Sequence, residues 1–167
     1  HAMSRRQRQM CIRDRSGRGA RGLMQLMPRT AAEMGRDRRF RRGKGRDALF
    51  NPKINIELGS KYLSHLMYNG DKVRNLFKTL AAYNAGPGKL GRWESKINYQ
   101  NDPLMFMESI PSPETRNFIE QVFIGLWIYR FRLDQPAPSL TQLAEGNWPH
   151  YKSVSNKKMG GFSNARN

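Results

Sequence analysis

The chain has 167 residues, a normal size for one domain or for one domain with a tail. It carries 30 Lys and Arg against 13 Asp and Glu, which gives a formal net charge of +17. Its single cysteine, Cys11, excludes an internal disulfide, its three histidines lack metal-site spacing, and no apolar run approaches the roughly 20 residues of a membrane span. We therefore expect no metal and no cofactor.

The positive charge is concentrated at the front of the chain. Residues 1 to 46 carry a net charge of +12, and residues 47 to 167 carry only +5. A strongly basic chain suggests an acidic polymer or an anionic surface as its partner. The stretch "RRFRRGKGR", 38 to 46, has one aromatic and two glycines, so we expect a solvated basic loop and no nucleic-acid partner. The start, "HAMSRRQRQM", is not followed by the apolar stretch of a secretory signal.

From Gly22 onward the sequence predicts an all-α fold, because no run alternates strictly between apolar and polar residues. In "PRTAAEMG", Thr30 and Glu33 have the spacing of a capping box, and Gly35 marks the helix end. The next helix starts at Asn51 and Pro52 and ends at Gly70. Its apolar stripe has members four apart: Ile54, Leu58, Tyr62 and Leu66.

Two further helices follow. Asp71 is expected to cap the first, which reaches Asn84, and Ser112 with Pro113 opens the second. The predicted apolar face of the second helix consists of Phe118, Val122, Leu126, Tyr129 and Leu133, widened by Phe123 and Trp127. After it the chain is rich in Pro, Gly, Ser and Asn. We expect a short helix over 139–144, packing by Trp148 and Tyr151, and a disordered end.

Asn84 raises a question of function, because it lies in line with the apolar stripe of its helix, just before Gly86, Pro87 and Gly88. A buried amide needs hydrogen-bond partners. Those partners are either the carbonyls of its own helix end or a ligand, and the residues of this stretch alone leave both open.

The stretches "GARGLMQLMPRTA", "NPKINIELGSKYL", "LAAYNAGPGKLGRW" and "ESIPSPETRNFIEQV", in this order, resemble the soluble lytic transglycosylases. The resemblance covers roughly residues 16–133 and implies a lysozyme-like helical fold of the goose type. It places an atypical basic segment at 1–15 and an irregular extension at 134–167. It also implies cleavage of peptidoglycan, a periplasmic or cell-envelope location, and a monomer.

The same resemblance implies the residues of a glycan-binding cleft. Tyr83 and Asn84 match the turn that lines the cleft beside the catalytic carboxylate, and Glu114 matches a carboxylate facing it. The remaining cleft residues implied are Ser16, Met24, Gln25 and Met27. Some of these residues have a structural alternative: the methionines as core, and Glu114 as an acid stabilised by the dipole of its helix. Arg116, close to Glu114 in the same motif, could equally be an ion-pair partner.

The proton donor is missing from this pattern. Lytic transglycosylases, as the resemblance implies, use one glutamate first as acid and then as base, and form a 1,6-anhydro sugar. The matching position here is Gln7, and an amide has no proton to give. Asp14 is the only carboxylate before Glu33, and its neighbours Arg13 and Arg15 favour its ionised form.

Residues 1–15 also lack apolar periodicity, and "MCIRDR" resembles a translated sequencing-adapter fragment. We hypothesise that this segment is not native; the alternative is a genuine relative that has lost catalysis and still binds glycan. The sequence therefore predicts a lytic transglycosylase domain that is inactive in this chain. The other candidates are a non-catalytic peptidoglycan-binding module and, less favoured, a basic nucleic-acid-binding protein.

Overall fold

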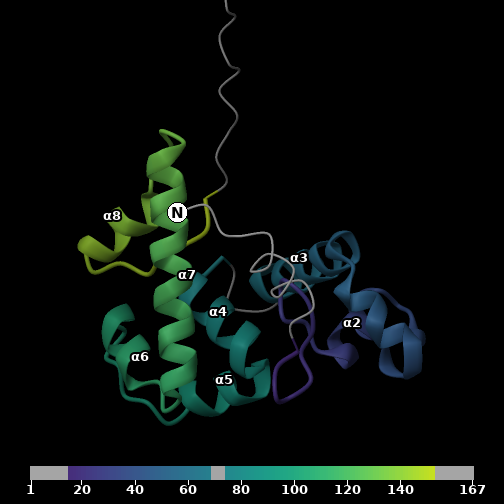
Figure 1. Cartoon of the computed structure of the whole chain (residues 1–167). Helices are drawn as coiled ribbons and strands as arrows, with labels where there is room; N and C mark the ends of the chain where they lie inside the picture. Colours follow the sequence, from purple (N-terminus) through teal and green to yellow (C-terminus); the bar gives the residue numbers. More distant parts are fainter. Residues whose placement is uncertain (1–14, 69–73, 153–167) are drawn as a thin grey trace, which may run out of the picture. The chain divides into compact units, whose positions relative to one another are not determined.

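The computed structural model describes residues 15–68 and 74–152. The chain divides into two compact units, His1–Val73 and Arg74–Asn167. The described residues contain helices and isolated β-bridges and no strand, which confirms the all-α expectation (Figure 1). Some of the predictions concern residues outside the described ranges, namely Gln7, Asp14, Asp71 and the last dozen residues.

The first unit contains α2 (Pro28–Met34), the 3-10 helices η1 (Arg38–Arg41) and η2 (Gly43–Phe50), and α3 (Pro52–Tyr68). These elements enclose a small core of aliphatic side chains: Leu26, Ala31, Leu49 and Leu58 are buried in one cluster. Half-buried side chains of the same elements pack around it, namely Met34, Phe40, Ile54 and Tyr62.

Helix α2 does not begin as predicted. Thr30 is not its cap, because Pro28 occupies the first turn and Met27 precedes the helix without a side-chain cap. Proline is favoured at this position because its missing N–H is not needed there, so the helix starts earlier than the capping box indicated. Glu33 instead pairs with Arg29, with Nε and Oε1 3.2 Å apart. Gly35 ends the helix as predicted.

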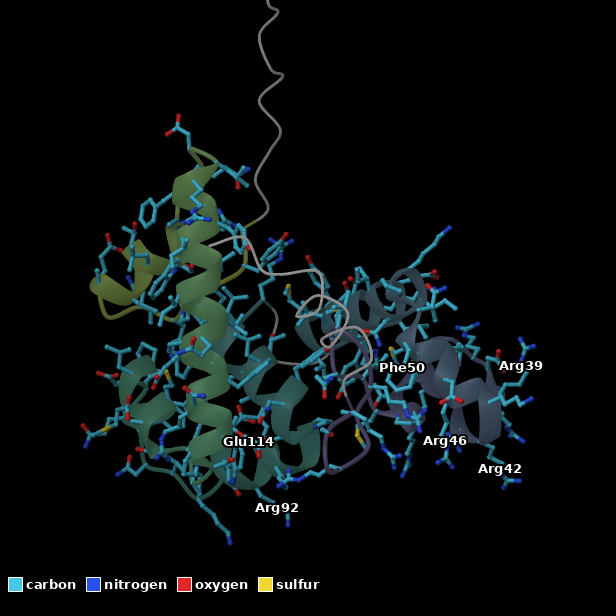
Figure 2. All side chains as sticks on the ribbon, in the orientation of Figure 1. Arg39, Arg42, Arg46, Phe50, Arg92 and Glu114 are labelled. Carbon is cyan, nitrogen blue, oxygen red and sulfur yellow. The ribbon has the colours of Figure 1, made fainter. Side chains whose placement is uncertain are left out.

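The basic stretch 38–46 was expected to be a loop, but it forms η1 and the first half of η2. Asp37 starts this structure, because its Oδ1 accepts a hydrogen bond from the Arg39 N–H at 2.9 Å. The Arg39 guanidinium also donates to the Asp37 carboxylate, and this side-chain bond lowers the pKa of Asp37. Figure 2 shows Arg39 and Arg42 pointing away from η1 and η2.

Helix α3 begins where the sequence predicts. The Asn51 Oδ1 accepts hydrogen bonds from the N–H groups of Lys53 and Ile54, and Pro52 opens the helix. The last described residue of the helix is Tyr68, so the predicted end at Gly70 lies outside the described residues. Tyr62, half-buried against the core, has its pKa raised, mainly by burial of its phenol.

The second unit contains α4 (Leu76–Ala85), α5 (Pro87–Glu94), α6 (Pro103–Ser109), α7 (Pro113–Arg132) and α8 (Pro138–Ala144). The cap of α4 is Asn75, whose Oδ1 accepts from the Lys78 N–H at 3.1 Å, and the prediction of Asp71 is wrong for this helix. Helices α5 and α6 were not predicted, although Asp102 before Pro103 is a cap signal for α6.

Helix α7 has the predicted cap, and its buried face agrees with the prediction in part. Ser112 Oγ accepts from the Thr115 N–H at 3.3 Å. Phe123, predicted to widen the apolar face, is buried, but Tyr129 is 66% exposed and Leu133 is 63% exposed, so the end of the predicted stripe does not face the core. The buried side chains of α7 are Thr115, Ile119, Phe123 and Arg130. This face wins because the Phe77 ring of α4 packs edge-on against Phe123, with centroids 4.9 Å apart.

The C-terminal extension packs on the second unit through residue 152. Helix α8 lies close to the predicted range, and Figure 1 shows it beside α7. The Trp127 Nε1 donates to Ser139 Oγ at 3.1 Å. The Trp148 ring lies against the Phe106 ring, with centroids 5.5 Å apart, and the Tyr151 N–H donates to the Arg74 carbonyl. The predicted packing by Trp148 and Tyr151 is therefore confirmed.

Candidate functional site

The candidate site of the second unit is built on the turn between α4 and α5. Gly86 has φ of 91° and ψ of 147°, a conformation that residues with a side chain rarely adopt. Its N–H donates to the Ala82 carbonyl at 2.9 Å and so closes the end of α4. Pro87 starts α5 at once. The turn leaves Tyr83 and Asn84 in the last turn of α4.

Asn84 does not cap its own helix end; its partner lies on α7. The Thr115 Oγ1 lies 2.7 Å from the Asn84 Oδ1 and 3.0 Å from Ser112 Oγ. An amide oxygen can only accept, so the single hydroxyl proton of Thr115 goes to Asn84, and the Ser112 hydroxyl donates to Thr115. This chain of three side chains fixes the orientation of the Asn84 amide.

The nitrogen of the same amide, unlike its oxygen, has no hydrogen-bond partner in the described residues. Among the described residues, the structure shows no acceptor for the Asn84 Nδ2, and the side chain is half-buried. An amide nitrogen carries two donor protons. Asn84 is therefore held by its oxygen and presents its nitrogen to whatever lies beside the turn.

An aromatic pair stands next to this amide. The rings of Tyr83 and Phe118 are stacked nearly parallel, with centroids 6.2 Å apart and an interplanar angle of 4°. Both residues are half-buried. Stacked rings of this kind provide a rigid apolar surface with a phenolic hydroxyl at its edge.

Glu114 lies in the exposed first turn of α7, next to Thr115 (Figure 2). A carboxylate in this position is stabilised by the helix dipole. Arg116 has a structural role, because its Nη1 donates to the Ile110 carbonyl rather than to a carboxylate. Sequence reasoning missed Thr115, although it stands between the two residues of this motif that were singled out.

In the first unit the predicted cleft residues lie on the segment 16–27 before α2, which forms two consecutive turns. Ser16 closes the first turn, because its Oγ and its carbonyl accept from the N–H groups of Ala20 and Gly19, at 3.0 Å and 2.9 Å. Gln25 has φ of 45°, and its Nε2 donates to the Gly22 carbonyl at 2.9 Å. The Gln25 side chain thus closes the turn that carries it.

A fully buried amide, which sequence reasoning missed, ties this turn to α3. The Asn55 Nδ2 donates to the carbonyls of Arg21 and Leu49, at 2.8 Å and 2.9 Å, and its Oδ1 accepts from the Met24 N–H at 2.7 Å. Gly22 lies so close that an added Cβ would sit 2.3 Å from the Leu49 carbonyl oxygen. Both residues are needed for this close packing.

The two methionines of the turn differ in their surroundings. Met24 packs on Gly59 of α3, where an added Cβ would lie 2.5 Å from the Met24 sulfur. Met27 is 42% exposed and lines a cavity of about 440 Å³ together with several arginines. The structure thus places Ser16, Met24, Gln25 and Met27 on the segment before α2, and Tyr83, Asn84 and Glu114 around the turn between α4 and α5.

Two negative findings concern the described ranges 15–68 and 74–152. Within them, no group of three or more His, Cys, Asp or Glu side chains is placed to hold a metal ion. No helix in the same ranges has both the length and the apolar character needed to cross a bilayer.

Comparison with known proteins shows the family of this chain. Residues 9–106 match the transglycosylase SLT domain. The soluble lytic murein transglycosylase of Salmonella typhimurium is 36% identical over 117 residues, which cover 70% of this chain and 18% of that protein.

Solved structures agree. The lytic transglycosylase Slt of Pseudomonas aeruginosa, crystallised as an inactive mutant, superposes with a TM-score of 0.64 at 37% identity, over 78% of this chain and 21% of that chain. The 70-kDa soluble lytic transglycosylase of Escherichia coli superposes with a TM-score of 0.66 at 31% identity, over 84% and 22%. This chain spans about a fifth of each relative, has their lysozyme-like helical fold, and belongs to the transglycosylase SLT domain family.

Proposed function

We propose that the chain is a peptidoglycan-binding lytic transglycosylase domain whose glycan contacts are present and whose general acid is absent. The observation that carries the proposal is the Asn84 amide, fixed by Thr115 through its oxygen and presenting its nitrogen beside the Tyr83 and Phe118 rings. Membership of the SLT family and relatives named as murein transglycosylases support peptidoglycan as the polymer.

The geometry suits a sugar that carries acetamido groups. The Asn84 Nδ2 can donate to an acetamido carbonyl or to a ring hydroxyl without giving up the bond that orients it. Sugars also have apolar ring faces, which pack on rigid aromatic surfaces such as the Tyr83 and Phe118 pair. A neutral hydrogen bond of this kind contributes about 0.5–1.5 kcal/mol, so binding requires several contacts along the strand.

Cleavage needs more than binding, because the glycosidic oxygen must receive a proton as the bond breaks. In this family one glutamate supplies it, and Gln7 occupies that position in the sequence, outside the described residues. A glutamine side chain cannot deliver that proton. We therefore expect the MurNAc–GlcNAc β-1,4 bond to be bound and left intact. The site of action follows from the polymer: the periplasm or cell envelope.

The experiment incubates the purified chain with insoluble peptidoglycan, measures the protein retained by sedimentation, and searches the supernatant for 1,6-anhydromuropeptides by mass spectrometry. We expect retention without product. An Asn84→Ala variant should be retained about threefold to tenfold less, because one hydrogen bond is lost, and Asn98→Ala, on an exposed loop residue, should behave as the parent chain.

Product formation by the parent chain would contradict the absence of the acid. Full retention of Asn84→Ala would contradict the site. Gln7→Glu separates an enzyme that has lost its acid from a module that never had the geometry to cleave. The first gains 1,6-anhydro product on restoration of the carboxyl, and the second binds glycan in both forms.

A further inference from the structure

The cavity beside Met27 lies wholly within the first unit, and it is lined mainly by cations. Its volume is about 440 Å³, within the range of small-molecule sites. Six of its nine lining residues are arginines: Arg15, Arg18, Arg21, Arg29, Arg41 and Arg46. Gly19, Met27 and Pro28 complete the wall. This set is brought together by folding, because it comes from the turn, α2, η1 and η2.

Two carboxylates pair with arginines of the cavity. Glu33 pairs with Arg29 at 3.2 Å and with Arg41 at 3.6 Å, and Asp47 pairs with Arg21 at 2.5 Å. Neither Glu33 nor Asp47 is among the residues that line the cavity, and the lining itself contains no acidic side chain. A wall of this composition attracts anions and raises their local concentration.

Arg21 supplies a second, independent observation. Its side chain is only 9% exposed, and the guanidinium lies over the Phe50 ring, 5.3 Å from the centroid. In the described residues, the Arg21 Nε is the one buried side-chain nitrogen or oxygen that lacks a hydrogen-bond partner. A buried N–H without a partner costs free energy, which a water molecule or an anion bound beside the guanidinium would recover.

We propose that this cavity binds a terminal phosphoryl group. Guanidinium groups match oxyanions by forked hydrogen bonds, and several of them around one cavity favour a ligand with two negative charges over one with a single charge. A phosphate monoester carries nearly two charges near neutral pH, whereas a phosphodiester and a carboxylate carry one. The proposal is independent of the glycan function, because none of its arginines is among the predicted cleft residues and it needs no cleavage.

The test is a titration with inorganic phosphate, followed by isothermal titration calorimetry near neutral pH at constant ionic strength. We expect saturable binding of one phosphate per chain. Dimethyl phosphate and acetate, with one charge each, should bind at least about tenfold more weakly. Binding of either as tight as that of phosphate would overturn the assignment to a terminal phosphoryl group, as would the lack of saturable binding.

Matched variants separate the cavity from the general charge of the unit. Arg29→Gln with Arg46→Gln removes two lining cations and should weaken phosphate binding by about tenfold for each. Arg38→Gln with Arg42→Gln removes the same charge from two exposed residues, one in η1 and one just before η2, that do not line the cavity. This control should change the affinity less than about twofold. Equal weakening in both double variants would reduce the cavity to a non-specific basic surface and overturn the proposal.

Discussion

Each unit has one candidate turn held by an asparagine, and the two amides are satisfied to different degrees. In the first unit Asn55 is fully buried, and both ends of its amide bond to backbone groups, three in all. In the second unit Asn84 is half-buried and held by the Thr115 hydroxyl through its oxygen alone. The difference separates an amide that shapes the fold from one that we propose is positioned for a ligand.

The largest effect is expected for Asn55→Ala. It removes three buried hydrogen bonds, those to the carbonyls of Arg21 and Leu49 and the one from the Met24 N–H. The Arg21 carbonyl still accepts from the Leu26 N–H, whereas a buried group left unsatisfied costs about 1–3 kcal/mol. The free energy of unfolding should therefore fall by about 3 kcal/mol or more, measured by urea denaturation. Ser64→Ala, at an exposed position of the same helix, is the control and should change it by less than about 0.5 kcal/mol.

Gly59→Ala tests the packing of the same turn on α3. An added methyl group meets the Met24 side chain, and such overpacking typically costs about 1–3 kcal/mol. In a Met24→Ala background the added methyl should be tolerated, so a double-mutant cycle in urea should give a coupling of at least about 0.5 kcal/mol. Additive costs would show that the turn does not rest on Gly59.

Asn84→Ala and Thr115→Val should change stability less than Asn55→Ala, by about 1 kcal/mol for the one hydrogen bond that the first loses and about 2 kcal/mol for the two that the second loses. Their main effect should be on retention by peptidoglycan. Thr115→Val removes the bond that orients the amide and keeps Asn84 itself, so it should weaken retention as well. Full retention by Thr115→Val would show that the fixed orientation of the amide is unimportant.

The smallest effect concerns Tyr62, whose pKa is raised chiefly by burial and secondarily by Glu33. Since the folded pKa lies above the unfolded value, the contribution of the neutral phenol is complete below the unfolded pKa and is lost as pH rises through the folded pKa. Unfolding measured from neutral to strongly alkaline pH should show a steeper loss of stability in the parent chain than in Tyr62→Phe. Identical slopes would contradict the burial of an ionisable phenol.

The sequence predicted the parts of the fold that depend on local chemistry. Asn51 with Pro52 and Ser112 with Pro113 set helix starts through bonds within three residues, so both predictions are confirmed. The capping box at Thr30 was wrong because Pro28 started the helix first. The face of α7 was right at Phe123 and wrong at Tyr129 and Leu133, because the buried face depends on where the Phe77 ring lies, which no pattern within α7 encodes.

The site shows the same limit. The motifs indicated Tyr83 and Asn84, but they did not indicate the hydrogen-bond partners of the two asparagines, Asn84 and Asn55. Those partners lie far from them along the chain. Thr115 is 31 residues from Asn84, and Met24 is 31 residues from Asn55. Arg41 and Arg46 of the arginine cavity lie in the stretch that was expected to be a solvated loop. The cavity itself was not predicted, because only folding brings Arg15 and Arg46 to the same wall.

The contrast between the two amides is tested most directly by NMR. The side-chain NH₂ signals of Asn55 and Asn84, assigned from substitutions that remove them one at a time, are followed while soluble peptidoglycan fragments are added. We predict that the Asn84 signals shift in a saturable way and that those of Asn55 stay unchanged. Saturable glycan binding that leaves the Asn84 signals in place would contradict the account.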